Sequence, residues 1–108
     1  MQMEGCMMMG LGYALSENLV LKDGKLMNPN FLDYKVLTAK DIPPIEAVII
    51  ETDEKDGPFG AKGIGEPGLV PTAPAIANAI YDAVGVRIKD LPITPEKVLK
   101  ALKEKEQR

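Results

Sequence analysis

The stretch GAKGIGEPGLVPTAPAIANAIYDAVG, residues 60–85, decides how this chain is organised, because a glycine-rich loop in it leads directly into a helix. After the loop, apolar residues recur every three or four positions, which is the spacing of one face of an α-helix. Thr72 is the predicted N-cap, and Gly85 stands where such a helix ends. We therefore predict a loop over residues 60–68 followed by a helix over residues 70–84.

Patterns on both sides of this stretch predict the other elements. Residues 2–19 show helical spacing, Asp23-Gly24 is a hairpin signal, and Thr94 opens a second C-terminal helix. The predicted fold class is α+β, in this order: an N-terminal helix, a β-hairpin, a further strand over residues 47–52, the glycine-rich loop, and two C-terminal helices separated by a short strand over residues 86–93. Residues 1–108 are expected to form a single domain with a modest core, and residues 103–108 a frayed charged tail.

The composition narrows the class of protein. The 108 residues carry a net charge of -3, with 45% apolar and 27% charged residues, as in ordinary soluble globular chains. The acidic balance argues against a nucleic-acid partner, and no apolar run approaches the roughly 18 residues that a membrane span requires. Because the chain starts without a signal-peptide pattern, the expected location is the cytoplasm.

Few side chains are available to bind a metal. The chain has one cysteine, Cys6, and no histidine. Zinc or iron–sulfur sites built by this chain alone are therefore not expected. Any general acid or general base in this chain must therefore be a carboxylate, a lysine or a tyrosine.

The glycine-rich loop is the main candidate for a functional site. Its glycines let the backbone approach a ligand closely, and the start of the following helix favours anions. The loop fits no nucleotide motif, because Lys62 is followed by glycine rather than Ser or Thr and the glycine spacing reverses that of the dinucleotide fingerprint. Pro67 restricts the backbone next to Glu66, and a general base needs such a fixed position. Spacing alone nevertheless favours the simpler interpretation, in which Glu66 is a helix-capping or solvated carboxylate.

Longer segments resemble a known family. Residues 57–102, GPFGAKGIGEPGLVPTAPAIANAIYDAVGVRIKDLPITPEKVLKAL, resemble the C-terminal end of the molybdenum-binding subunit of the xanthine dehydrogenase and aldehyde oxidoreductase family. QMEGCMMMGLGYALSE, residues 2–17, and NPNFLDYKVLTAKDIPPIEAVIIET, residues 28–52, resemble the segments that precede it there. The resemblance covers essentially the whole chain in order, and KGIGEP is its most specific motif.

The resemblance implies a role for particular residues. Glu66 matches the active-site glutamate, which takes a proton during the oxidative hydroxylation of an aldehyde or N-heteroaromatic substrate. Gly63, Ile64 and Gly65 match the loop beside the molybdenum centre, and Gln2 matches a glutamine near the molybdopterin-type cofactor. Because the pterin holds the metal in this family, the resemblance assigns no metal ligand to this chain.

The resemblance also implies that the site is incomplete in this chain. The expected partners are the remainder of the molybdenum subunit and electron-transfer subunits that carry iron–sulfur clusters and FAD. The chain alone is expected to bind no molybdenum and to be inactive, whether it is a terminal fragment or a separately encoded piece. Two other hypotheses stay open: a small module that binds an anion at the glycine-rich loop, and a structural remnant that self-associates through exposed apolar side chains of its first helix.

Overall fold

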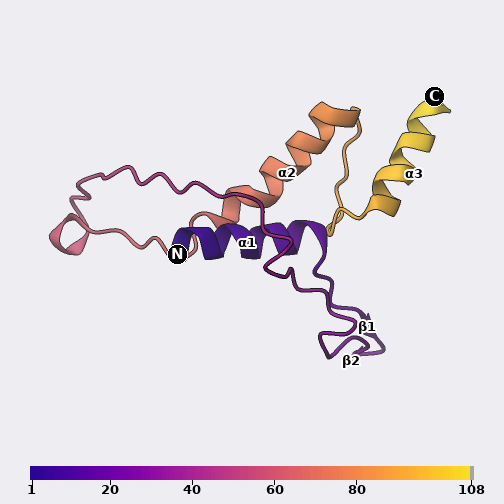
Figure 1. Cartoon of the computed structure of the whole chain (residues 1–108), viewed down its shortest axis with the longest axis horizontal. Coiled ribbons are helices and arrows are strands. Elements are labelled where there is room, and N and C mark those ends of the chain that lie inside the picture. The colour runs from indigo at the N-terminus through magenta and orange to yellow at the C-terminus, as the bar shows by residue number, and fades with distance from the viewer. Residues whose placement is uncertain (108) are drawn as a thin grey trace.

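The computed structural model describes residues 1–107, which form three α-helices, a short 3-10 helix and one two-stranded antiparallel sheet (Figure 1). The elements in chain order are α1 (Gln2–Leu15), β1 (Leu21–Lys22), β2 (Lys25–Leu26), η1 (Pro58–Gly60), α2 (Leu69–Val84) and α3 (Pro95–Glu106). The described chain is mainly helical, and it belongs to the α+β class only through the small hairpin.

The main packing contact is the crossing of α1 and α2. A Cβ atom built at Gly10 of α1 would lie 2.6 Å from the Cβ of Thr72 in α2, so the two helices approach more closely than a side chain at position 10 would allow. Cys6 and Ala14, also in α1, are only 2% and 0% exposed. A glycine inside a helix costs about 1 kcal/mol relative to alanine, and here it permits the close crossing.

The ends of α2 confirm one predicted cap and correct the other. Gly85 adopts the left-handed conformation, with φ 68°, and donates its N–H to the Tyr81 carbonyl at 2.7 Å, as a C-terminal glycine does. The N-cap, however, is Gly68 rather than Thr72. Thr72 lies inside the helix, and its hydroxyl donates to the Gly68 carbonyl at 2.6 Å. The helix starts early because a turn before it, closed by the Leu69 N–H, already sets the helical path.

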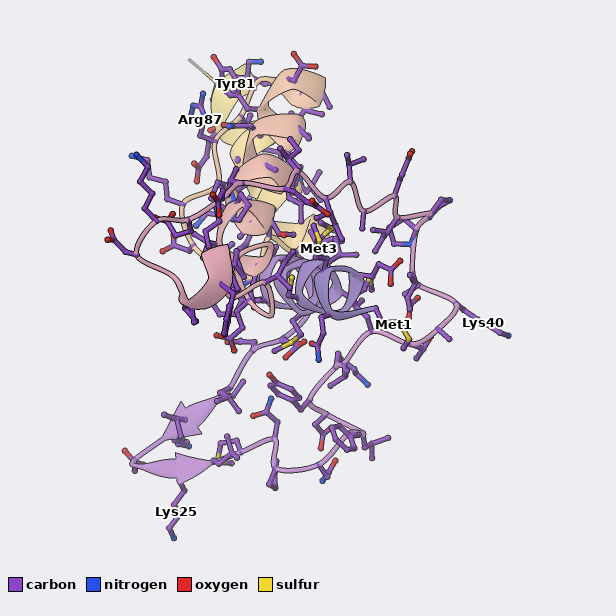
Figure 2. The ribbon with its side chains drawn as sticks, turned by 90° about the vertical axis from the view of Figure 1, so that its left-hand side faces the viewer. Met1, Met3, Lys25, Lys40, Tyr81 and Arg87 are labelled. Atoms are coloured by element: carbon purple, nitrogen blue, oxygen red, sulfur yellow. The ribbon has the colours of Figure 1, made fainter. Side chains whose placement is uncertain are left out.

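The predicted hairpin forms at Asp23 and Gly24. Their φ values of 50° and 75° are the two positive values typical of a type I′ turn. Leu21 of β1 lies opposite Leu26 of β2 in antiparallel register. Figure 2 shows the hairpin projecting away from the helices, with the Lys25 side chain directed outward. Both strands are exposed on both faces, so the hairpin adds no core.

Polar side chains tie the base of the hairpin to the end of α1. The buried Asn28 side chain accepts a hydrogen bond from the Val20 N–H at 2.9 Å and donates one to the Asn18 carbonyl at 2.6 Å. Nearby, the Tyr34 hydroxyl donates to Glu17 at 2.5 Å. This hydrogen bond to the Glu17 carboxylate raises the pKa of Tyr34 above its ordinary value.

The two other predicted strands are wrong for the described chain. Residues 47–52 are extended, but they form no backbone hydrogen bond to any other described residue. Residues 86–93 form an irregular connection, in which the Ile93 N–H donates to the Ala14 carbonyl of α1 at 2.7 Å. A strand forms only where a neighbouring strand bonds its N–H and C=O groups, and within residues 1–107 the sheet consists of β1 and β2.

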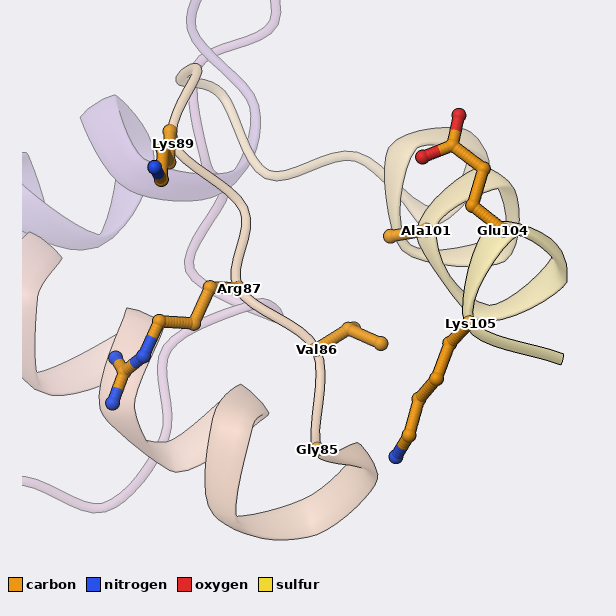
Figure 3. Close-up of a pocket in the computed structure, with 7 residues that line it drawn as sticks. All are labelled: Gly85, Val86, Arg87, Lys89, Ala101, Glu104 and Lys105. Atoms are coloured by element: carbon orange, nitrogen blue, oxygen red, sulfur yellow. The ribbon is translucent and has the colours of Figure 1, made fainter. Parts of the chain in front are cut away.

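The last helix, α3, begins at the predicted cap. The Thr94 hydroxyl accepts the Lys97 N–H at 3.4 Å, and Pro95 is the first helical residue. Figure 3 shows the Lys105 side chain directed toward the end of α2, where it donates to the Val84 carbonyl at 3.2 Å. The helical geometry extends to Glu106, and the predicted fraying of residues 103–108 stays a prediction, with Arg108 outside the described residues.

The described chain builds little core of its own. The buried apolar residues among those described are Cys6, Ala14, Val86 and Ile93. The radius of gyration is 17.5 Å, whereas a compact chain of this length would have about 13 Å. The accessible surface is 8853 Å², whereas a folded monomer of this mass exposes about 5,900 Å². The expected modest core is therefore reduced to the α1–α2 crossing and the connection before α3. Within residues 1–107, each helix falls short of the length and apolar character that a membrane span requires.

Candidate functional site

The predicted loop is part of a long extended segment, residues 46–67, which we call the arm. Figure 1 shows the arm leaving the helices and returning to the start of α2. Its far turn is η1, where Phe59 and Gly60 both have positive φ values, 54° and 75°. The Glu54 N–H donates to the Gly60 carbonyl at 3.2 Å and closes this turn. The Phe59 side chain is fully exposed, so nothing among the described residues packs against it.

Glu66 lies at the end of the arm, three residues before α2 begins. Its side chain is exposed, and it forms no hydrogen bond or ion pair with the described residues. Only its backbone carbonyl is engaged, by the Leu69 N–H at 3.0 Å. Because Gly68 is the N-cap and no side chain caps α2, the interpretation of Glu66 as a helix cap is wrong. Within this chain the Glu66 carboxylate faces solvent.

Gly63 and Ile64 line an open groove of about 910 Å³ between the two runs of the arm. The opposite wall is formed by residues 48–53, of which Val48, Ile49 and Ile50 are apolar, and Phe59 lies at the far turn. A Cβ atom built at Gly63 or at Gly65 would have no neighbour within 4 Å. The backbone of the predicted cofactor loop is therefore accessible to a bulky group from outside the chain.

The structure brings the start of α1 beside this loop. Met3 lines the same groove as Ile64. Gln2 precedes Met3 at the first position of α1 and is exposed. Gln2 and Glu66 are not among the residues that line the groove, and the described chain contains no hydrogen bond between them. Of the predicted site residues, Gly63 and Ile64 line the groove, and Gly65 and Glu66 follow them directly in the chain.

Gly68, directly after the arm, packs closely against α1, and the sequence did not predict this contact. A Cβ atom at Gly68 would lie 2.7 Å from the Sγ of Cys6 and 3.4 Å from the Cγ of Met7. Cys6 is itself held in place, because its thiol donates to the Met3 carbonyl at 3.0 Å. Gly68 therefore allows the loop to pass directly over α1. The sequence signal for this contact is a fourth glycine placed between the KGIGEP motif and the helix.

The start of α2 offers little to an anion. Of its first three residues, Pro71 has no N–H, and the N–H of Leu69 already bonds the Glu66 carbonyl. Only the N–H of Val70 stays available in the first turn, and the exposed Glu66 carboxylate precedes it. Anion binding at a helix start requires several converging N–H donors. This geometry weighs against an anion site at the start of α2, whereas anion binding by the backbone of the glycine-rich loop stays a hypothesis.

Comparison with known proteins identifies the family. Residues 1–43, which span α1 and the hairpin, match the model of the molybdopterin cofactor-binding domain. The chain is 43% identical over 99 residues to the xanthine dehydrogenase molybdenum-binding subunit of Escherichia coli O157:H7, covering 90% of this chain and 13% of that subunit. It is also 43% identical over 104 residues to the aldehyde oxidoreductase molybdenum-binding subunit PaoC of Escherichia coli K12, covering 94% and 14%. The chain thus spans about a seventh of the length of these relatives.

The fold also matches solved structures. The crystal structure of quinoline 2-oxidoreductase from Pseudomonas putida 86 superimposes with a TM-score of 0.84 at 30% identity, covering 95% of this chain and 14% of that chain. The irregular connections and the extended arm are therefore arranged as in a segment of a much larger protein. The chain belongs, as a segment, to the molybdopterin-binding subunits of the xanthine dehydrogenase and aldehyde oxidoreductase family.

Proposed function

We propose that this chain is the C-terminal piece of a molybdenum hydroxylase and supplies Glu66 as the active-site base for oxidation of an aldehyde or an N-heteroaromatic substrate. One observation carries the proposal: Glu66 ends an accessible glycine loop with its carboxylate exposed and engaged by no described side chain. A solvated loop carboxylate such as Asp56 also lacks a partner, so Glu66 is singled out by its place in KGIGEP, the most specific motif of the resemblance. Glu66 has its only local bond through its backbone.

The residues of the loop fit a molybdopterin-type cofactor. Within residues 1–107, no group of three or more His, Cys, Asp or Glu side chains could hold a metal ion. This donor set suits a metal that arrives with its own organic ligand. The accessible backbone of Gly63 and Gly65, and the apolar Ile64 between them, would lie against that cofactor, with Gln2 near the pterin. When bound, the cofactor supplies the two-electron redox chemistry of the reaction.

Glu66 would contribute a proton acceptor in a defined place. Pro67 restricts the backbone directly after it, and the bond from Leu69 to its carbonyl holds the turn. A general base must lie within hydrogen-bond reach of the proton that it removes, and the end of a braced turn meets this need better than a flexible loop does. The remainder of the subunit would exclude water from the carboxylate, which is exposed in this chain.

The test is the Glu66→Gln variant in the assembled enzyme. Glutamine keeps the size and hydrogen-bonding shape of the side chain but cannot accept the proton at neutral pH. We expect cofactor content to be retained and turnover to fall by about 100-fold to 10,000-fold, the range for loss of a general base. Turnover would be measured with an aldehyde and with an N-heteroaromatic compound, and molybdenum by elemental analysis.

Asp56→Asn is the matched control, because Asp56 is an exposed carboxylate in the same arm but does not line the groove. The control variant should keep normal turnover and normal molybdenum content. If Glu66→Gln also keeps near-normal turnover, Glu66 is not the base. Loss of molybdenum in Glu66→Gln alone would assign the residue to cofactor binding instead.

The proposed partners are the remainder of the molybdenum subunit and electron-transfer subunits with iron–sulfur clusters and FAD. The supporting observation is the surplus of exposed surface, roughly 3,000 Å² above that of a compact chain of this mass. Self-association of the isolated chain stays a second candidate, because exposed apolar side chains such as Met9 of α1 would drive it. A melting temperature that rises with protein concentration would indicate self-association.

A further inference from the structure

The run of residues 46–52, EAVIIET, is extended and has no partner within the described chain. Val48, Ile49 and Ile50 are 68%, 64% and 82% exposed. No backbone N–H or C=O of residues 46–52 forms a hydrogen bond with any of residues 1–107. Consecutive side chains of a strand point to opposite faces, so three apolar β-branched residues in a row expose apolar surface on both faces. That pattern is typical of a strand covered on both faces within a larger fold.

We propose that residues 46–52 form a β-strand by adding to the edge of a sheet in the remainder of the molybdenum-binding subunit. Two observations favour this partner. The relatives that match this chain extend far beyond it, since the match covers only 13% to 14% of their length. The surplus surface of roughly 3,000 Å² exceeds what a standard interface buries on one partner, about 800 Å², so covering it takes an interface of the size found in permanent assemblies. This inference rests on the proposed function for the identity of the partner.

The strand would also position the active-site loop. Residues 48–53 form the groove wall opposite Gly63 and Ile64. The Glu54 N–H bond to the Gly60 carbonyl links the end of this run to the turn that leads into the loop. A sheet that holds one run of the arm therefore limits the movement of the other. Residues 46–52 act on the site through this geometry and are positioning residues.

The experiment uses a chimera in which this chain replaces the matched 99 residues of the Escherichia coli O157:H7 subunit. Amide hydrogen exchange is measured over residues 46–52 in the isolated chain and in the chimera. In the isolated chain these amides should exchange at the rate of unstructured peptide. In the chimera those that bond the sheet should exchange at least about 100-fold more slowly.

Proline substitutions test the backbone role directly. Successive N–H groups of a strand point to opposite sides, so Val48→Pro and Ile49→Pro remove bonds on different edges. In the chimera at least one of them should raise exchange of the other amides in residues 46–52 by about tenfold or more. Ala39→Pro is the matched control, because Ala39 is exposed and its N–H is unbonded within the described chain. It should leave exchange in residues 46–52 unchanged.

The outcomes separate this inference from the proposed function. A folded chimera with unprotected amides in residues 46–52 overturns the strand, whatever Glu66→Gln does to turnover. Protected amides together with normal turnover in Glu66→Gln keep the strand and reject the catalytic role. A chimera that fails to fold, where the natural relative folds, also counts against the strand, because the sheet edge then does not accept this chain.

Discussion

The α1–α2 crossing and the arm differ in almost every physical respect. The crossing buries Cys6 and Ala14 and brings Gly10 against Thr72, whereas the arm exposes nearly all of its side chains and closes one turn by backbone hydrogen bonds. Yet the arm carries Glu66 and the accessible glycine loop. The residues that stabilise the fold and the residues proposed for catalysis are therefore different residues. Substitutions should therefore affect stability or turnover, but rarely both.

The largest loss of stability is expected for Gly10→Val. Its side chain would overlap Thr72, whose Cβ lies 2.6 Å from the position of a Cβ at residue 10. Overpacking of this kind should lower the free energy of unfolding by roughly 3 kcal/mol. The measurement is urea denaturation followed by circular dichroism at 222 nm.

Gly5→Val is the matched control in the same helix. Nothing lies within 4 Å of a Cβ at Gly5, so this variant should change the free energy of unfolding by no more than about 0.5 kcal/mol. Equal stability of the two variants would show that the crossing does not hold the chain together.

A smaller loss is expected for Asn28→Ala. The substitution removes the bonds to Val20 and Asn18 and leaves two backbone groups without their partner at the base of the hairpin. We expect a loss of about 1.5 kcal/mol, with the change in amide chemical shifts confined to residues 18–34. Shift changes that reach α2 would contradict the independence of the hairpin from the crossing.

Thr94→Ala should cost less, because it removes one helix cap. The Thr94 hydroxyl accepts the Lys97 N–H, and loss of such a cap costs about 1 kcal/mol. The helical chemical shifts of the first turn of α3 should weaken, while those of α1 and α2 stay unchanged. Thr94→Ser keeps the hydroxyl and should behave as the natural chain does. An equal effect of both substitutions would exclude the cap.

The smallest effect is expected in the arm. Ile50→Ser replaces a side chain that is 82% exposed and touches no core, so the free energy of unfolding of the isolated chain should change by less than about 0.5 kcal/mol. The same denaturation measurement applies. A loss comparable to that of Gly10→Val would mean that the arm contributes to the core, and the division into two sets of residues would fail.

Elements with local signals were predicted from the sequence. The hairpin follows from Asp23-Gly24, the start of α3 from Thr94, and the end of α2 from Gly85, because each of these residues acts on its own backbone. The predicted N-cap at Thr72 was wrong because the turn from Glu66 to Leu69 starts the helix earlier. Such competition between two overlapping turns is not visible in residue preferences.

Features that depend on distant partners were not predictable. A strand over residues 47–52 follows from the β-branched run, but the described chain supplies no neighbour to bond it. In the site, the motif singled out Glu66 and the glycines, whereas the contacts of Gly68 with Cys6 and of Met3 with the groove arise only when α1 and the loop meet in space. The catalytic assignment of Glu66 stays a prediction.

The surplus surface has a calorimetric consequence. Covering it would remove roughly 3,000 Å² on this chain, and a similar area on a partner, from water. Burial of mixed surface on that scale should lower the heat capacity by on the order of 1 kcal/mol per kelvin. The enthalpy of association would then change steeply with temperature. Association that releases little heat at low temperature would become strongly exothermic when the temperature is raised.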